Sequence, residues 1–185
     1  SNEEQEALTS YLIPFLNFEK HFPLLPGAKD MLTHANFMGL DEEQLFSVRI
    51  ALADKIRMSV EDLKKKKEIQ KSLEALPFKD GDKIAVLGDS NADDMGGWFY
   101  IFKHLVEETR KDLKLQWVNH AVSYHNSTDL LRQASRTIIA EEADWYFCAV
   151  GLFDCARLDV SPNRPMIALA ESWENLAAIE DIIEK

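Results

Sequence analysis

The sequence predicts an α/β protein in which a parallel sheet follows a helical N-terminal region. Residues 84–87 are four consecutive apolar residues bounded by Gly81 and Gly88, a pattern typical of a buried strand. Two further apolar segments, 115–118 and 145–150, follow the first, with a helical pattern between each pair. Upstream of the first strand, apolar residues recur instead at three- and four-residue steps, which indicates helices.

The composition narrows the functional classes. The chain has 185 residues, the length of one to one and a half domains. Its hydrophobic content of 46% is ordinary for a globular protein and is enough for a sizeable core. The net charge of −11 disfavours nucleic acid and anionic membrane surfaces as partners. No apolar run reaches 18 residues and no signal peptide is seen, so we expect a cytoplasmic protein without a membrane span, a removed leader being the alternative. We expect no cofactor.

The two cysteines, Cys148 and Cys155, are not spaced as a CxxC pair, and no further cysteine could complete a metal set. We therefore expect reduced thiols and no metal site.

Residues 1–80 are predicted to form the helical region. Short helical turns and loops are expected over 3–40, because prolines and Gly27 interrupt the apolar residues. A helix over 41–57 begins with Asp41 as N-cap and Gln44 at the capping-box position. Ser59 is expected to cap a second helix that ends near residue 76. The apolar stripes of this region predict packing on the α/β domain or on a second copy of the region.

The run of four lysines at 64–67 has two interpretations, a phosphate-binding cluster and a solvated helix face. The acidic residues that flank the run favour the solvated face.

Residues 81–185 are predicted to form the α/β domain. A helix over 97–111 links the first two strands, and Asn126 or Ser127 caps the helix that precedes the third. Residues 159–167 are expected to be loop, and a last amphipathic helix covers 168–184. Right-handed crossovers place the first strand in the middle, in the order 2-1-3.

Three turns at the carboxyl ends of the strands carry the polar residues of interest. Gly88-Asp89-Ser90 follows the first strand, the segment 119–124 (Asn-His-Ala-Val-Ser-Tyr) follows the second, and the segment 151–154 (Gly-Leu-Phe-Asp) follows the third. Ligands bind at this edge of open α/β sheets. A serine at the first position can act as a nucleophile, a helix cap or a turn residue.

This order of motifs resembles the GDSL, or SGNH, hydrolase family, whose blocks are Gly-Asp-Ser, Asn-x-x-x-Ser-Gly and Gly-x-Asn-Asp. The resemblance implies a three-layer, flavodoxin-like parallel sheet, and an incomplete one, because the family continues with further strands. It also implies a serine ester hydrolase of the esterase, lipase or acylhydrolase type that acts on a small ester or acylated substrate. In that pattern Ser90 is the nucleophile and its own N–H is the first oxyanion donor. Asp89 and Asp154 are the other residues of the pattern that remain.

The sequence departs from the family at three points. Tyr124 stands where the family has the block-two glycine, and its N–H can donate provided the turn needs no positive φ. Phe153 stands where the family has an asparagine amide donor. No Asp-x-x-His occurs, which leaves His125 as the local substitute for the base or as an ordinary polar loop residue. Asp154 can equally tie a loop to backbone N–H groups.

Three functional hypotheses follow. The chain is a GDSL-type ester hydrolase whose remaining part is missing, or a non-catalytic relative that serves as a binding or assembly module. A flavodoxin-like phosphate or nucleotide binder is the third, without a Gly-rich phosphate motif to support it. We expect the Ser90 hydroxyl to be exposed in a shallow cleft, and Asp93 and Asp94 to form a solvated turn or hold a cation. A homo-oligomer would form through the N-terminal helices or the open sheet edge.

Overall fold

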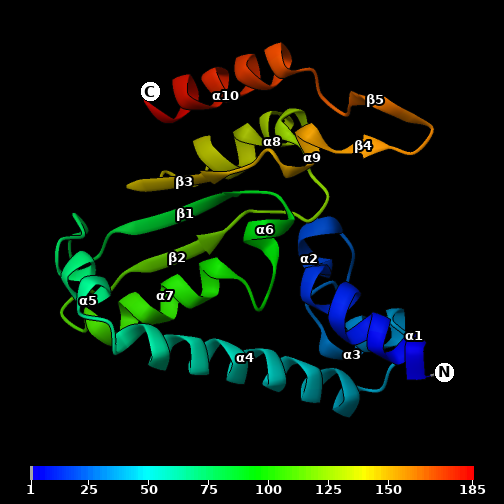
Figure 1. The fold of residues 1–185 in the computed structure, drawn as a ribbon, viewed down its shortest axis with the longest axis horizontal. Coiled ribbons are helices and arrows are strands. Elements are labelled where there is room, and N and C mark those ends of the chain that lie inside the picture. Colours follow the sequence, from blue (N-terminus) through cyan, green and yellow to red (C-terminus); the bar gives the residue numbers. More distant parts are fainter. Residues whose placement is uncertain (1) are drawn as a thin grey trace. The chain divides into compact units, whose positions relative to one another are not determined.

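The structure, a computed structural model, describes residues 2–185 and divides into two compact units. The helical unit comprises Ser1–Leu76 and Asp94–Lys111, and the sheet unit comprises Pro77–Asp93 and Asp112–Lys185. The chain thus leaves the sheet unit after the first strand, contributes one helix to the helical unit, and returns. Figure 1 labels the elements of both units.

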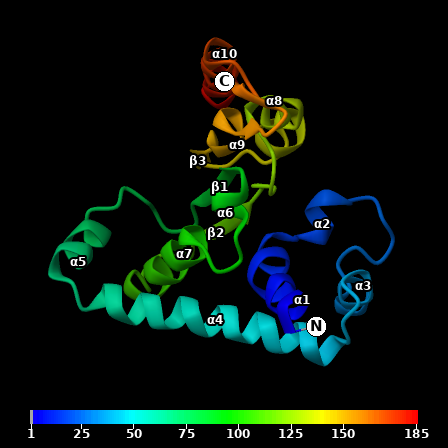
Figure 2. The ribbon, with the colours of Figure 1, turned by 45° about the vertical axis from the view of Figure 1, so that its right-hand side comes forward.

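The helical unit begins with short helical segments, as the sequence predicts for residues 3–40. Two long helices follow, α4 (Glu42–Lys64) and α7 (Trp98–Thr109), and they lie side by side (Figure 2). The remaining elements of this unit are α1 (Asn2–Ala7), η1 (Leu8–Leu12), η2 (Ile13–Phe15), α2 (Phe18–His21), α3 (Met31–Phe37) and α5 (Lys67–Glu74).

Helix α4 confirms its predicted start and corrects its predicted end. The Asp41 side chain accepts the Gln44 N–H at 2.7 Å, and the Gln44 side chain accepts the Asp41 N–H at 3.0 Å, so the capping box is complete. The prediction that Ser59 caps a second helix was wrong. Its hydroxyl donates to the Lys55 carbonyl at 2.9 Å inside α4, and with no glycine or proline nearby the helix runs on to Lys64.

The lysine run forms a solvated face. Lys64 pairs with Glu61 and Glu108, and Lys65 pairs with Asp62 at the surface.

A core of four buried residues, Ile13, Ala35, Met38 and Leu45, joins the N-terminal segments to α4 in the helical unit. Leu16, Met31, Leu40 and Val48 pack against it. The aromatic N-terminal stretch therefore has a buried apolar partner on the first turns of α4.

The sheet unit contains three parallel strands in the predicted order β2-β1-β3. They are β1 (Lys83–Gly88), β2 (Gln116–Asn119) and β3 (Trp145–Ala149) (Figure 1). Residues 84–87 of β1 are fully buried, as predicted for a central strand. Val86 pairs with Asn119 and Gly88 pairs with Ala149, so the carboxyl ends of all three strands meet at one edge.

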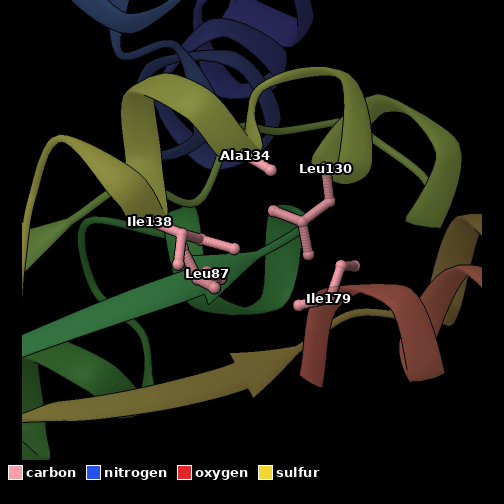
Figure 3. Packing of buried hydrophobic residues seen from close by; sticks show 5 residues of the cluster. All are labelled: Leu87, Leu130, Ala134, Ile138 and Ile179. Carbon is pink, nitrogen blue, oxygen red and sulfur yellow. The ribbon is translucent and has the colours of Figure 1, made fainter. Parts of the chain in front are cut away.

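One face of this sheet packs on helices of the same unit. Leu87 contacts a cluster formed by α8 (Ser127–Arg132), the following helical turn η3 (Ser135–Ile139) and α10 (Leu169–Ile183). Figure 3 shows Leu130, Ala134, Ile138 and Ile179 converging on Leu87. Asn126 caps α8 by accepting the Asp129 N–H, which selects the first of the two predicted caps.

The other face carries a cluster of aromatic rings. Phe78 makes edge contacts with Trp117, Trp145 and Phe147, whose centroids lie between 5.5 and 6.5 Å from its own.

The predicted loop at 159–167 is in part a small hairpin. Strands β4 (Arg157–Leu158) and β5 (Ser161–Pro165) pair in antiparallel fashion. The prolines at 162 and 165 argued against a strand, because proline cannot donate a hydrogen bond to a neighbouring strand. Proline is accepted on an edge strand, where its position faces away from a partner.

Within the described residues, no strand pairs with the outer edge of β3. No helix of the described chain is long and apolar enough to cross a membrane.

Candidate active site

The three predicted turns converge within the sheet unit. Ser90 begins the short helix α6 (Ser90–Asp93) directly after β1. The turn after β2 hydrogen-bonds back to β1, with the Val122 N–H donating to the Gly88 carbonyl at 3.1 Å. The turn after β3 leads into α9 (Leu152–Cys155), which the Asp89 carboxylate contacts. The structure therefore brings Asp89, Ser90 and Tyr124 together, as the motif order predicts.

Gly88 is required by the close approach of β1 and β3. A Cβ atom at this position would lie 2.6 Å from the Ala149 carbonyl oxygen and 3.1 Å from the Ala92 Cβ. The first contact is to backbone and could not be relieved by a side-chain rotation. The glycine thus allows β1 and β3 to approach closely at the strand end that precedes Ser90.

Asp89 is a fully buried residue that joins two of the turns. One carboxylate oxygen accepts the Asn91 N–H and the other accepts the Leu152 N–H, both at 3.0 Å. Its role in the structure is to hold the turn after β3 against the start of α6.

Ser90 lies at the centre of the site, with its hydroxyl oxygen accepting the Tyr124 N–H at 3.0 Å. Tyr124 has φ = +67°, the left-handed conformation that glycine adopts without cost. From the sequence, the Tyr124 N–H was expected to donate only if the turn needed no positive φ. That condition was wrong, because φ is positive and the N–H still donates. For a residue with a Cβ this conformation costs about 1–2 kcal/mol.

The expected exposure of Ser90 is contradicted. Only 8% of the residue's surface is accessible, because the turn after β2 lies against it. The Tyr124 side chain is itself exposed, and its ring meets the Phe153 ring edge-on at 5.4 Å. Tyr124 and Phe153, which depart from the donor residues of the resembled pattern, thus contact one another.

Asp93 has a role that sequence reasoning missed. It is fully buried, whereas a solvated turn or a cation site was expected. One of its carboxylate oxygens accepts both the N–H and the hydroxyl of Ser123, each at 2.8 Å. It thereby anchors the residue that precedes Tyr124. The signal in the sequence that could have indicated this role is a carboxylate about one helical turn after Ser90. Among the described residues, no group of three or more acidic, histidine or cysteine side chains could hold a metal ion.

Asn119 makes a second anchor between the same two turns. Its amide nitrogen donates to the Ala92 carbonyl at 2.8 Å, and its amide oxygen accepts the Ala121 N–H at 2.9 Å.

Asp154 is placed in a buried polar network. Its carboxylate accepts the Ser127 N–H at 2.7 Å and the hydroxyl of Ser172 on α10. Asn175 donates to the Ser127 hydroxyl at 3.0 Å and extends this network. These contacts tie the start of α8 to α9 and α10, in keeping with the loop-tying interpretation of Asp154.

His125 lies in the turn after β2, where its Nδ1 accepts from the Gln133 amide at 3.1 Å. In a neutral ring this contact puts the proton on Nε2, which then cannot take a proton from a serine. Across residues 2–185, the Ser90 hydroxyl hydrogen-bonds neither a histidine nor a carboxylate.

Cys148 is the other nucleophile type close to this edge of the sheet. Desolvation, and then the negative charge of Asp89, raise the pKa of its thiol above the usual 9.0. A reactive cysteine needs the opposite shift. Cys148 and Cys155 form no disulfide in the described part of the chain.

Comparison with known proteins supports the fold of this region. No protein-family profile and no curated protein sequence matches the chain. Two solved structures are similar, both variants of an acetylxylan esterase from Geobacillus stearothermophilus. One is a catalytic mutant with alanine in place of a histidine (TM-score 0.51, 21% identity), and the other carries isoleucine in place of a tryptophan (TM-score 0.50, 23% identity).

Each match covers 56% of this chain and 55% of the esterase, so the chain spans about half the length of the structures that it resembles. At this identity the likeness concerns the fold alone. Over about half of its length, the chain has the fold of this acetylxylan esterase, in keeping with the fold that the resemblance to SGNH hydrolases predicts.

Proposed function

We propose that the sheet unit carries the nucleophile half of a GDSL-type serine ester hydrolase site, with Ser90 as the nucleophile. The observation that carries this proposal is the Tyr124 N–H directed at the Ser90 hydroxyl from a glycine-like backbone conformation. A residue with a Cβ in this conformation is strained, and backbone strain of this kind clusters at active sites and ligand clamps.

The proposed donors for a developing oxyanion are the N–H groups of Ser90 and Tyr124, the second of which would turn from the Ser90 hydroxyl oxygen to the substrate oxygen. The Asn91 N–H is already taken by Asp89, whereas the Ser90 N–H, at the first position of α6, donates to no described residue. A third donor is absent because Phe153 has no polar side-chain atom. The loss of one such donor costs roughly 10²–10³ in rate.

A serine also needs a general base, and the described residues supply none at its hydroxyl. We therefore expect the chain by itself to hydrolyse small esters very slowly. The likeness to an acetylxylan esterase makes a short acetyl ester the natural first substrate.

A non-catalytic binding module is the second candidate. The contact between the Tyr124 and Phe153 rings and the low exposure of Ser90 favour it, because both limit access to the hydroxyl.

Turnover of p-nitrophenyl acetate by the intact chain tests the proposal, with Ser90→Ala to isolate the serine-dependent rate. We expect a slow rate that Ser90→Ala removes and His125→Ala leaves nearly unchanged. Phe153→Asn should raise the serine-dependent rate about tenfold or more, because it supplies an amide donor. Leu152→Asn, the same change one residue earlier, is the matched control and should not.

The hydrolase proposal is refuted if Ser90→Ala leaves the rate unchanged both in the otherwise unaltered protein and in the Phe153→Asn protein. The binding module then remains. Robust turnover lost in both Ser90→Ala and His125→Ala would instead make His125 the base.

A further inference from the structure

A cavity of about 670 Å³ lies entirely within the helical unit, between α4, α7 and the N-terminal segments. Its volume is in the range of small-molecule sites. Its lining residues are of two kinds: Lys29, His34 and Arg49 are polar, and Leu52 and Ile56 of α4 are apolar. Neither the fold likeness nor the proposed hydrolase site involves these residues.

The polar lining is built on a buried histidine. His34 is only 3% exposed, and its ring packs against Phe18 with centroids 5.5 Å apart. Its Nδ1 accepts from Nη2 of Arg49 at 2.8 Å, so the ring proton is on Nε2, which contacts the Ala28 carbonyl. These contacts hold the Arg49 guanidinium in one place at the cavity wall.

The positive charge of Arg49 is not neutralised by the described residues. Its Nε is buried without a hydrogen-bond partner, and no carboxylate in that part of the chain pairs with it. Lys29 also forms no ion pair with a described residue. A partly buried cation without a counter-charge is costly, and an anion in the cavity would offset that cost.

The charges at the cavity favour an anion of single charge. Lys29 and Arg49 face one acidic lining residue, Glu19, whose carboxylate lies 3.8 Å from Nε2 of His34. The cavity therefore carries one excess positive charge in a protein whose net charge is −11. Leu52, Ile56 and Met95 add an apolar wall that a bare inorganic ion would leave unused.

We infer that this cavity binds a small organic carboxylate with an apolar body, anchored by the Arg49 guanidinium. The carboxylate pairs with Arg49 and Lys29, and the apolar body lies along Leu52 and Ile56. Arginine suits this role because its charge is permanent and its guanidinium carries several N–H donors. The inference does not depend on the proposed activity of Ser90.

Titration of the full chain with hexanoate, acetate and inorganic phosphate tests the inference. The readouts are the side-chain Nε–H resonance of Arg49 and the melting temperature. We expect hexanoate to shift the Arg49 resonance and raise the melting temperature, acetate to act more weakly, and phosphate to do neither. The Nε–H resonance of Arg57, which pairs with Asp54 at the surface of α4, is the internal control and should not move.

Two variants locate the site. Arg49→Gln should weaken hexanoate binding at least about tenfold, the factor expected for the loss of one charge-assisted hydrogen bond, whereas Arg57→Gln should not. Ala53→Asp adds a negative charge at an exposed lining position without touching the contact between His34 and Arg49, and should abolish binding, whereas Ala53→Ser should retain it.

The variants Ala53→Asp and Ala53→Ser keep the test decisive if Arg49→Gln does not fold. The inference is overturned if hexanoate leaves the Arg49 resonance unmoved, if phosphate binds as well as hexanoate, or if Ala53→Asp binds hexanoate like the unaltered protein.

Discussion

Asp93 illustrates how much of the site depends on single buried side chains. Its carboxylate accepts two hydrogen bonds from Ser123, and Ser123 precedes the one residue whose N–H contacts the Ser90 hydroxyl. The position of the Tyr124 N–H, the proposed oxyanion donor, is therefore set by a carboxylate that does not itself contact the Ser90 hydroxyl.

We predict that Asp93→Ala lowers the free energy of unfolding by about 3 kcal/mol, because it leaves a buried N–H and a buried hydroxyl without their acceptor. The matched control is Asp94→Ala. Asp94 is the adjacent, partly exposed carboxylate and accepts one N–H, from Gly96. The control should cost less than about 1 kcal/mol.

Urea unfolding of both variants at neutral pH measures the difference. Equal effects of the two substitutions would contradict the anchoring role of Asp93.

At the scale of the elements, a charged cluster joins β1 to the segments that flank it. Glu141, which follows η3, accepts from His120 at 2.8 Å and lies 3.2 Å from Nζ of Lys83 on β1. Burial alone would raise the pKa of Glu141, but the hydrogen bonds from His120 and Lys83 outweigh it and lower the pKa below its usual 4.5. The same Lys83 also donates to the Glu141 carbonyl, so the cluster fixes the start of the central strand.

The sign of this shift predicts an acid-dependent contribution to stability. A carboxyl group whose pKa is lower in the folded state stabilises that state at pH values above its unfolded pKa. The contribution is lost as the pH falls below about 4.5 and through the folded-state pKa. Glu141→Gln should therefore be less stable than the unaltered protein at pH 7, and the difference should shrink toward pH 3.

Thermal unfolding across this pH range checks the prediction. Asp62→Asn is a suitable control, because Asp62 also pairs with a lysine but is fully exposed and should show a much smaller effect. A Glu141→Gln difference that stays constant with pH would contradict the assignment.

At the scale of the whole molecule, the N-terminal segments supply buried contacts to the helical unit. Ile13, Ala35 and Met38 cover Leu45 on α4, and the Pro14 carbonyl accepts the Met95 N–H at 2.8 Å. Most of this small core would be lost if residues 1–40 were removed.

Deletion of residues 1–40 should lower the melting temperature clearly, because uncovering Leu45 alone costs about 2 kcal/mol. Deletion of residues 1–10 removes no member of that core and serves as the control. Circular dichroism melts of the two truncated proteins make the measurement. An unchanged melting temperature in the longer deletion would show that the segment is an independent appendage.

The features that the sequence predicts correctly depend on residues close together in the chain. The four apolar residues of β1, the capping box at Asp41 and a helix cap at Asn126 or Ser127 are local signals. The order of the strands follows from connection rules that need only the order of the elements. The same applies to the motif order, which predicts Ser90 at a strand end beside the turn that contains Tyr124.

What only the tertiary structure decided depends on residues far apart in sequence. The positive φ of Tyr124 and the burial of Asp93 arise where the turns after β1 and β2 meet. The cavity at Arg49 exists because three separate segments close around it, and the pairing of Arg49 with His34 spans 15 residues. Backbone strain and the burial of charge are set by such contacts, because no local pattern of residue types specifies which distant groups will enclose them.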